Sequence, residues 1–476
     1  MAANQSAVLE NEVADIASTY RRVQAQDVSP SDLVRACLER IGQLNPRLNA
    51  FITILADDAL DQAKAAEGEI EVGKWRGPLH GIPIAIKDFY DTAGIRTTAA
   101  FEHFRNRVPT KDAAGVARLK EAGAIIIGKT NMHQLGMGTT GLESYFGAVK
   151  NPWNDLYIPG GSSSGSAAAV ASGMCFATLD TDAIGSCRLP AACCGVVGLK
   201  GTHGLVDSTG ILDGEEDPGE MIRWFSSPGI TARTVEDVAL MLDVLATRRD
   251  RAAGSYFDGL NKDRNLRVGV GDNFRADEDV MNAFEQAVER IHSLGFSTRD
   301  VDIPFYDPAA GLNNIEADRN AIADRAFNDI DVLLLPTTPT AVPTVKDASS
   351  NPQALSPENT MFANYYGLPA ISIPCGFDKN GLPVGLQVVG KPWDEASVLQ
   401  FAYRFGMALA GGGRREAGSG RGKREAGSRQ RVTRLRVTRY GRRALRLCVN
   451  PLPATRYPLP ASRLPPPASL PPNLVP

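Results

Sequence analysis

The chain has 476 residues, of which 43% are hydrophobic and 22% are charged, and its formal net charge is −3. These values are ordinary for a soluble globular protein, and the length allows one large α/β enzyme or two to three smaller domains. No apolar run is long enough to cross a bilayer, the first residues lack the basic and apolar regions of a signal peptide, and seven scattered cysteines indicate neither a disulfide framework nor a metal site. We therefore expect a cytoplasmic protein without a metal.

Helices and strands are predicted to alternate along the first 410 residues. Apolar residues that recur every three or four positions indicate helices, and short runs of aliphatic residues indicate buried strands. The expected helices lie within 1–30 and at 31–44, 57–70, 113–122, 234–245 and 280–294, and the expected strands at 50–54, 82–87, 124–128, 266–270 and 331–336. This alternation predicts an α/β layered fold.

A stretch rich in glycine and serine, residues 160–166, precedes an Ala-rich helix-forming run. A flexible linker has this composition, but element-forming sequence flanks the stretch on both sides. The spacing Gly161-x-Ser163-x-Gly165 matches the nucleophile elbow of α/β-hydrolases, although that motif needs a buried strand before it and residues 154–160 form a poor one. Glycines and hydroxyls at a helix start provide close backbone approach and hydrogen-bond donors for a bound group.

Taken with its surroundings, this stretch resembles the amidase signature family. The matching segments are 160–169, Thr181-Asp182, Gly185-Ser186, Arg188, 190–192 and 195–200, together with 81–88, 128–132, 367–370 and 381–387. They extend over most of residues 30–408. The resemblance implies one large mixed, twisted β-sheet covered by helices on both faces, a small-molecule amide as substrate, and neither a metal nor an organic cofactor.

The resemblance also implies a triad of a lysine, a serine preceded by a cis peptide bond, and a nucleophilic serine. In this chain these are Lys87, Ser162 and Ser186, and the two serines keep the family's spacing of 24 residues. An unactivated serine needs a base, and a lysine can serve when burial keeps it neutral. The residues alone leave a second interpretation open, in which Lys87 is a structural lysine paired with Asp88 or Asp91.

Around the triad, the resemblance places an oxyanion hole made of backbone N–H groups. The oxyanion and substrate-binding positions are Ala183, Ile184, Gly185, Ser186 and Gly136, and the supporting positions are Ser163, Asp182 and Arg188. Ser163 is expected to cap the following helix or to replace Ser162 as a proton bridge. Asp182 and Arg188 are expected to organise the loop as structural charges. The histidines expected on the surface or in the polar core, rather than in catalysis, are His103, His133 and His203.

The chain departs from the family's usual pattern in the signature and in the roof of the site. The family usually has Thr-Gly-Gly-Ser where residues 183–186 read Ala-Ile-Gly-Ser, and it usually has glycine at the position of Asp180. Ile184 adds bulk beside the acyl site. The segment around 304–330, which covers the active site in the family (the roof segment), is much shorter than the helices that usually stand there. Residues 317–319 look like a join between two stretches that are normally well apart. Substrate preference is therefore expected to be broad or poor.

The chain changes character after residue 410. Residues 411–476 hold 15 Lys/Arg and two Asp/Glu, a net charge of +13, and ten prolines lie between 451 and 476. We expect a disordered tail outside an amidase domain of residues 1–410, because such sequence buries little apolar surface. A basic arm for nucleic acid is disfavoured, since no stacking aromatic residues or fold accompany the charge.

Three functions fit these features. The first is an amidase that hydrolyses a carboxamide through an acyl-enzyme on Ser186, with no membrane partner and with a homodimer left open. The second is the glutaminase (A) subunit of a tRNA-dependent Asp/Glu amidotransferase, which shares the fold and the triad; it is placed second because residues 133–135 depart from that subunit's usual acidic sequence. The third is an amidase-fold remnant whose shortened roof impairs catalysis.

Overall fold

The structure is a computed structural model that describes residues 14–215, 219–247, 254–262, 264–307 and 311–418. The predicted disordered tail lies outside the described residues from 419 onward, so it stays a prediction. Helix α15, Glu395–Gly418, continues eight residues past the expected domain boundary at 410, and the folded unit ends with it.

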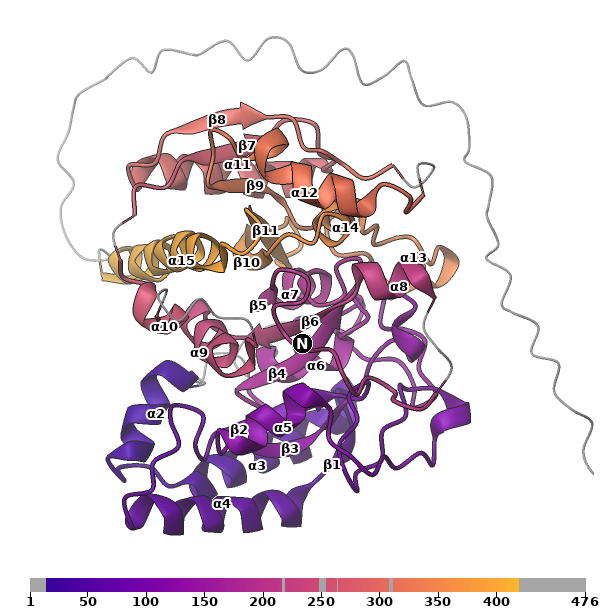
Figure 1. The fold of residues 1–476 in the computed structure, drawn as a ribbon, viewed down its shortest axis with the longest axis vertical. Helices are drawn as coiled ribbons and strands as arrows, with labels where there is room; N and C mark the ends of the chain where they lie inside the picture. Colours follow the sequence, from indigo (N-terminus) through magenta and orange to yellow (C-terminus); the bar gives the residue numbers. More distant parts are fainter. Residues whose placement is uncertain (1–13, 216–218, 248–253, 263, 308–310, 419–476) are drawn as a thin grey trace, which may run out of the picture. The chain divides into compact units, whose positions relative to one another are not determined.

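An 11-stranded mixed sheet runs through the described chain in the order β1-β3-β2-β4-β6-β5-β10-β11-β9-β7-β8 (Figure 1). Its strands are β1 Phe51–Ile54, β2 Pro83–Lys87, β3 Ile125–Thr130, β4 Ala177–Asp182, β5 Val197–Lys200, β6 Ser227–Ala232, β7 Val268–Gly271, β8 Thr298–Val301, β9 Val332–Pro336, β10 Ala370–Phe377 and β11 Pro383–Gly390. Strand β2 is parallel to β3 and β4, and β7 is parallel to β8 and β9, while the other pairs are antiparallel. The predicted α/β fold with one large mixed sheet is confirmed.

Helices flank this sheet, and local sequence sets where they begin. Helix α3 starts after Ser29, whose hydroxyl accepts the N–H of Asp32 (3.0 Å), with Pro30 at the first helical position. The other helices are α2 Ile16–Gln24, α4 Ala56–Glu71, α5 Ala114–Glu121, α6 Ser164–Ala171, α7 Arg188–Cys194, α8 Glu220–Phe225, α9 Val235–Leu245, α10 Tyr256–Gly259, α11 Glu278–Ser293, α12 Ile315–Ala326, α13 Val345–Ser350 and α14 Glu358–Tyr365, with α3 itself spanning Pro30–Leu48 and short 3₁₀ turns at Glu102–Phe104 and Gln134–Gly136.

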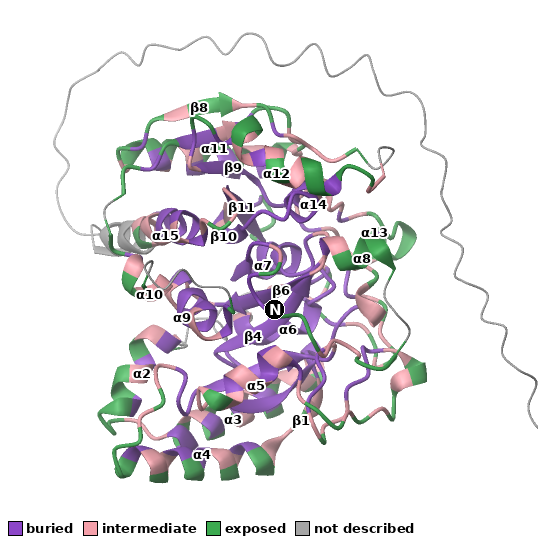
Figure 2. Cartoon of the chain, viewed as in Figure 1, coloured by how far each residue is buried: buried purple, intermediate pink, exposed green. Residues whose placement is uncertain are grey.

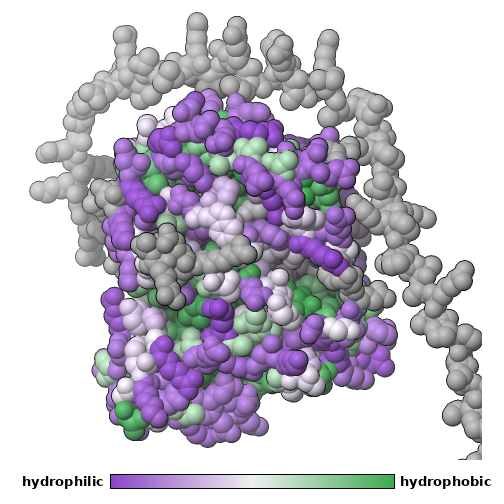
Figure 3. Space-filling model, in the orientation of Figure 1, coloured by the Kyte–Doolittle hydropathy of each residue, from purple (hydrophilic) through white to green (hydrophobic). Residues whose placement is uncertain are grey.

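Burial is concentrated in the middle of the sheet and in the helices that touch the signature. Every residue of β2, β4 and β6 is buried, and so is every residue of α7. Figure 2 shows this buried centre, with α4 and β8 exposed on their outer sides. On the face drawn in Figure 3, hydrophilic residues dominate the two ends and hydrophobic ones show mainly between them. Within the described ranges, no helix combines the length and apolarity needed to cross a bilayer.

The segment predicted to be a shortened roof, around 304–330, contains helix α12, and the predicted join at 317–319 lies within this helix. Arg319 Nε donates to the carbonyl of Tyr365 (2.7 Å) and its Nη2 to that of Asn364 (3.1 Å). Asp318 Oδ2 accepts the hydroxyl of Tyr365 (2.6 Å). Residues of the join therefore fix α12 against the C-terminal end of α14.

Candidate active site

Three chain segments converge at one end of strands β2 and β4. Lys87 is the last residue of β2, residues 160–164 lead into α6, and residues 182–187 form the loop from β4 to α7. The N–H of Ser163 donates to the carbonyl of Ser186 (3.1 Å), which joins the second segment to the third. All three predicted triad residues belong to these segments.

Lys87 is fully buried, and its Nζ contacts three hydroxyl groups. The distances from Nζ are 2.8 Å to Ser162 Oγ, 2.9 Å to Ser163 Oγ and 2.8 Å to Thr181 Oγ1. Burial lowers the pKa of Lys87 to about 8, against the opposing influence of Asp180, which favours the charged form. A lysine with this pKa is partly neutral near pH 7 and is able to accept a proton.

The two carboxylates that could have made Lys87 a structural lysine are engaged elsewhere. Asp88 accepts hydrogen bonds from the N–H and the hydroxyl of Thr98. Asp91 forms a bidentate pair with Arg107, with N–O distances of 2.6 and 2.9 Å. The contacts of Lys87 with hydroxyl groups therefore favour its interpretation as a base.

The peptide bond between Gly161 and Ser162 is cis, as the resemblance implies. Ser163 occupies the N-cap position of α6, yet its side chain makes no capping hydrogen bond. Its hydroxyl instead accepts from Lys87 and donates to the carbonyl of Thr181 (3.4 Å). The expected capping role of Ser163 is wrong, because the hydroxyl belongs to the cluster around the lysine.

The loop after β4 carries the predicted oxyanion donors. The N–H of Gly185 donates to Asp182 Oδ1 (2.8 Å), so this amide is already occupied and Gly185 is removed from the expected donors. In the described part of the chain, the N–H groups of Ala183, Ile184 and Ser186 have no protein acceptor. These three amides are the ones available to a substrate oxygen.

Glycine is required at position 185 for a different reason. Its φ angle is +125°, and an added Cβ would lie 2.4 Å from Thr360 Oγ1 and 2.9 Å from Leu189 Cγ. Gly136 also has a positive φ, +71°, and a Cβ there would lie 3.7 Å from Ser162 Oγ. Gly185 thus allows a close approach of the backbone to α14 and α7, whereas at Gly136 it is the positive φ that favours glycine.

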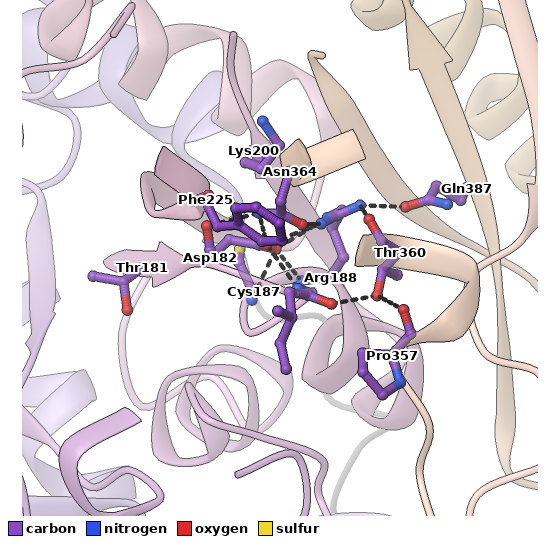
Figure 4. Close-up of polar contacts among 12 residues, drawn as sticks. Thr181, Asp182, Cys187, Arg188, Lys200, Phe225, Pro357, Thr360, Asn364 and Gln387 are labelled. Atoms are coloured by element: carbon purple, nitrogen blue, oxygen red, sulfur yellow. Dashed lines mark hydrogen bonds and ion pairs between the residues drawn. The ribbon is translucent and has the colours of Figure 1, made fainter. Parts of the chain in front are cut away.

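A buried ion pair supports the loop (Figure 4). Asp182 and Arg188 are both fully buried, and Oδ1 of the first lies 2.9 Å from Nη2 of the second. Burial alone would raise the pKa of Asp182, but the guanidinium of Arg188 holds it well below its usual range, so the carboxylate is ionised. Arg188 also donates to the Thr360 carbonyl (3.0 Å), Gln387 Oε1 (2.5 Å) and Asn364 Oδ1 (2.6 Å). These contacts fit the expected role of structural charges.

Helix α14 supplies site residues that the sequence did not indicate. Thr360 Oγ1 donates to the carbonyl of Ile184 (2.5 Å), and Asn364 Nδ2 donates to the carbonyl of Asp182 (3.0 Å). These partners are more than 170 residues apart in the chain and meet only in the tertiary structure. The motif at 367–370, just after α14, was the one sequence signal close to them.

The three histidines occupy positions of the expected kind. His103 is exposed, His203 is half-buried, and His133 is buried with its Nε2 3.6 Å from Glu143 Oε2. Burial lowers the pKa of His133, and it lowers that of His203 to about 4. His133 is nevertheless close to the site, because its backbone N–H donates to the carbonyl of Ser162 (3.0 Å).

Comparison with known proteins identifies the family to which the chain belongs. The family model described as Amidase matches residues 32–323 and 312–399. The chain belongs to the amidase family. Amidases of this family are hydrolases that act on amide C–N bonds, and this chain is accordingly an enzyme of that class. The two matched ranges overlap at 312–323, within and beside α12, in the segment that the sequence predicts to be shortened.

Curated relatives of this amidase carry a more specific name. The chain is 33% identical over 466 aligned positions to the A subunit of the glutamyl-tRNA(Gln) amidotransferase from Sulfurihydrogenibium sp., covering 80% of this chain and 94% of the relative. It is also 33% identical, over 467 positions, to the same subunit from Carboxydothermus hydrogenoformans, covering 81% and 95%. The chain thus spans nearly the whole length of both relatives.

Solved structures with the same fold include amidases. A crystal structure of an amidase is 28% identical with a TM-score of 0.71, covering 83% of this chain and 99% of that one. The native peptide amidase of Stenotrophomonas maltophilia is 26% identical with a TM-score of 0.70, covering 84% and 97%. A 6-aminohexanoate cyclic dimer hydrolase with bound substrate is 25% identical with a TM-score of 0.70, covering 84% and 98%.

Substituting Gly185 by alanine is expected to lower kcat by about 10²-fold or more, because the added methyl group would displace the loop that carries the predicted oxyanion donors. Gly204→Ala is the matched control, since Gly204 also has a positive φ, +81°, but has no atom within 4 Å of an added Cβ. Steady-state kinetics of both variants, with folding checked by circular dichroism, would measure the effect. Equal losses of kcat in the two variants would contradict this role for Gly185.

Proposed function

We propose that this amidase hydrolyses carboxamides through an acyl-enzyme formed on Ser186. The observation that carries the proposal is the buried Lys87, whose Nζ lies 2.8 Å from Ser162 Oγ beside the segment that contains Ser186. A buried lysine among hydroxyl groups, with its pKa lowered to about 8, has the properties of a base that activates a serine.

The proposed reaction begins when neutral Lys87 takes a proton from Ser162, which takes one from Ser186. Ser186 Oγ then attacks the carbonyl carbon, and the N–H groups of Ala183 and Ile184, with that of Ser186 itself, stabilise the negative oxygen. The tetrahedral species breaks its C–N bond, and the leaving ammonia or amine receives the proton back through Ser162. Water repeats the sequence on the ester and releases the carboxylic acid.

Labelling with a fluorophosphonate tests the nucleophile without knowledge of the substrate. The reagent forms a covalent phosphonyl ester with an activated serine and releases fluoride. Mass spectrometry of the labelled chain is expected to place the adduct on Ser186, and neither Ser186→Ala nor Lys87→Ala should label at a comparable rate. Adduct formation on Ser163 instead would support the nucleophile elbow and overturn the proposal.

The pH dependence of kcat/KM is expected to follow Lys87. Below its pKa the lysine is an ammonium ion and accepts no proton, so kcat/KM should rise with pH and level off above about 8. Residual hydrolysis by Lys87→Ala should not show this rise. A profile that is flat between pH 6 and 9 in the unmodified enzyme would contradict the assignment of Lys87 as the base.

A second candidate is the glutaminase subunit of an amidotransferase, in which the amide is the side chain of glutamine. The sequence alone favours a stand-alone amidase, but the curated relatives, 33% identical over 94% of one relative's length, favour the subunit. The name of those relatives identifies each as one part of a larger enzyme, which implies a protein partner for this chain as well.

Ammonia release separates the two candidates. The chain alone would be assayed with glutamine and with propionamide, which lacks the α-amino and α-carboxylate groups, and then again after co-expression with the remaining amidotransferase subunits. A glutaminase subunit should co-purify with them and gain activity on glutamine but not on propionamide. Equal activity on both amides, with no co-purification, would indicate the stand-alone amidase. An unlabelled Ser186 and no ammonia from either amide would indicate the impaired remnant.

A further inference from the structure

A second buried ionisable group, Asp180, lies directly beside Lys87. In the parallel pair of β2 and β4, Ile86 is paired with Leu179, so the next residues of the two strands, Lys87 and Asp180, are lateral neighbours. Side chains alternate along a strand, and paired residues of neighbouring strands share a face of the sheet. The carboxylate and the amine therefore start from the same face, one strand apart, and both residues are fully buried.

The hydrogen bonds of Asp180 leave one of its carboxylate oxygens unpaired. The hydroxyls of Thr178 and Thr231 both donate to Oδ2, each at 2.7 Å. Oδ1 has no partner at hydrogen-bonding geometry in the described part of the chain, although the nearby hydroxyl of Ser166 also favours the ionised carboxylate. A buried carboxylate with an unpaired oxygen is costly to ionise unless a positive charge is close. Burial raises the pKa of Asp180, and the positive charge of Lys87 is the influence that most opposes this shift and favours the ionised form.

The other ionisable groups around this pair do not offer a competing charge. Tyr90, whose hydroxyl donates to the carbonyl of Asp180 (2.6 Å), and Cys187 both have their pKa raised well above the usual range by burial, so they are neutral near pH 7. The remaining groups that act on Lys87, Asp180 or both are Cys175, Asp182 and His133. Burial keeps the Cys175 thiol and the His133 imidazole neutral by shifting their pKa values, and the charge of Asp182 is paired with Arg188.

We propose that the ionised Asp180 carboxylate stabilises the ammonium form of Lys87 and thereby sets the pH at which the lysine becomes available as a base. Asp180 is a positioning residue in this scheme, because it acts on the reaction only through Lys87. The inference rests on the proposed role of Lys87, and it concerns a position where this chain has an acid and the family signature usually has glycine.

The test compares the pH dependence of Ser186 labelling in the unmodified chain and in Asp180→Asn. Asparagine keeps the size of the side chain and an oxygen for the two threonine hydroxyls, but it removes the negative charge. The rising limb of the labelling rate should move to lower pH by roughly one unit or more, and labelling at pH 6.5 should become faster than in the unmodified chain. Asp237→Asn is the matched control, because Asp237 is another buried carboxylate but does not act on Lys87, and its limb should not move.

If the labelling rate rises over the same pH range in Asp180→Asn and in the unmodified chain, the inference is overturned. Should Asp180→Asn fail to fold, Thr231→Val removes one donor to Oδ2 while keeping the carboxylate, and a smaller shift in the same direction is expected; no shift there would overturn it equally. Failure of the proposed function would give a different result. The unmodified chain would then not label at Ser186, or the rise of the labelling rate with pH would remain in Lys87→Ala.

Discussion

Replacing Ser186 by alanine is expected to lower kcat for amide hydrolysis by roughly 10³-fold or more, and Lys87→Ala should cause a loss of similar size. The reason is that the nucleophile and its base act as a unit: without Lys87 the proton of Ser186 has no acceptor, and without Ser186 the base has nothing to activate. The double variant Lys87→Ala/Ser186→Ala should therefore be little worse than either single variant, because residues that act together are not additive. Amide hydrolysis by each purified variant, at several pH values, is the measurement.

A control for the loss of a buried serine is available at the other end of the same helix. Ser172 is 5% exposed and follows the last residue of α6, away from the lysine cluster. Ser172→Ala should keep kcat within about two-fold of the unmodified enzyme, since it removes a hydroxyl without a part in the chemistry. Near-normal turnover in a folded Lys87→Ala variant would remove Lys87 from the mechanism.

The fold class could be predicted because aliphatic runs mark β2, β3 and β9 and because helical periodicity marks α3 and α11. The centre of the sheet was not predicted from periodicity. Strands β4, β5, β6, β10 and β11 contain glycine, proline or polar residues that interrupt an aliphatic run. These residues are accommodated because helices pack closely there: an added Cβ on Gly198 would lie 2.7 Å from Ala191, and one on Gly385 would lie 2.7 Å from Ala192, both in α7.

The site could be predicted where its residues follow one another along the chain and not where the fold brings distant segments together. Lys87, the cis bond before Ser162 and the loop at 182–188 are all marked by local motifs. The prediction for Gly185 was correct in placing it in the loop but not in making its N–H an oxyanion donor, because nothing in the sequence indicates that this N–H would donate to Asp182. Likewise, the contact of Thr360 with the oxyanion loop depends on where β9, β10 and α14 lie.

The largest expected effect on stability is that of Arg188→Met, which should lower the free energy of unfolding by about 3–5 kcal/mol. Arg188 is fully buried and makes two contacts with Asp182, through Nε (3.0 Å) and Nη2 (2.9 Å), as well as contacts with Asn364 and Gln387. Methionine fills much of the same space but leaves Asp182 as an unpaired buried charge, which is where most of the cost arises. Urea unfolding followed by circular dichroism and fluorescence would measure the loss.

Two further variants show whether that loss comes from the unpaired charge. Arg325→Met breaks an exposed ion pair with Asp318 (3.4 Å; 56% and 30% exposed) and should change the unfolding free energy by no more than about 1 kcal/mol. The double variant Asp182→Asn/Arg188→Met should be less destabilised than the sum of the two single variants, because no buried charge is left once both partners are gone. A loss below about 1 kcal/mol in Arg188→Met, or full additivity in the double variant, would show that the loop at 182–188 does not depend on this pair. In that case the loop would have to be held mainly by the direct contacts of Thr360 with Ile184 and of Asn364 with the backbone of Asp182.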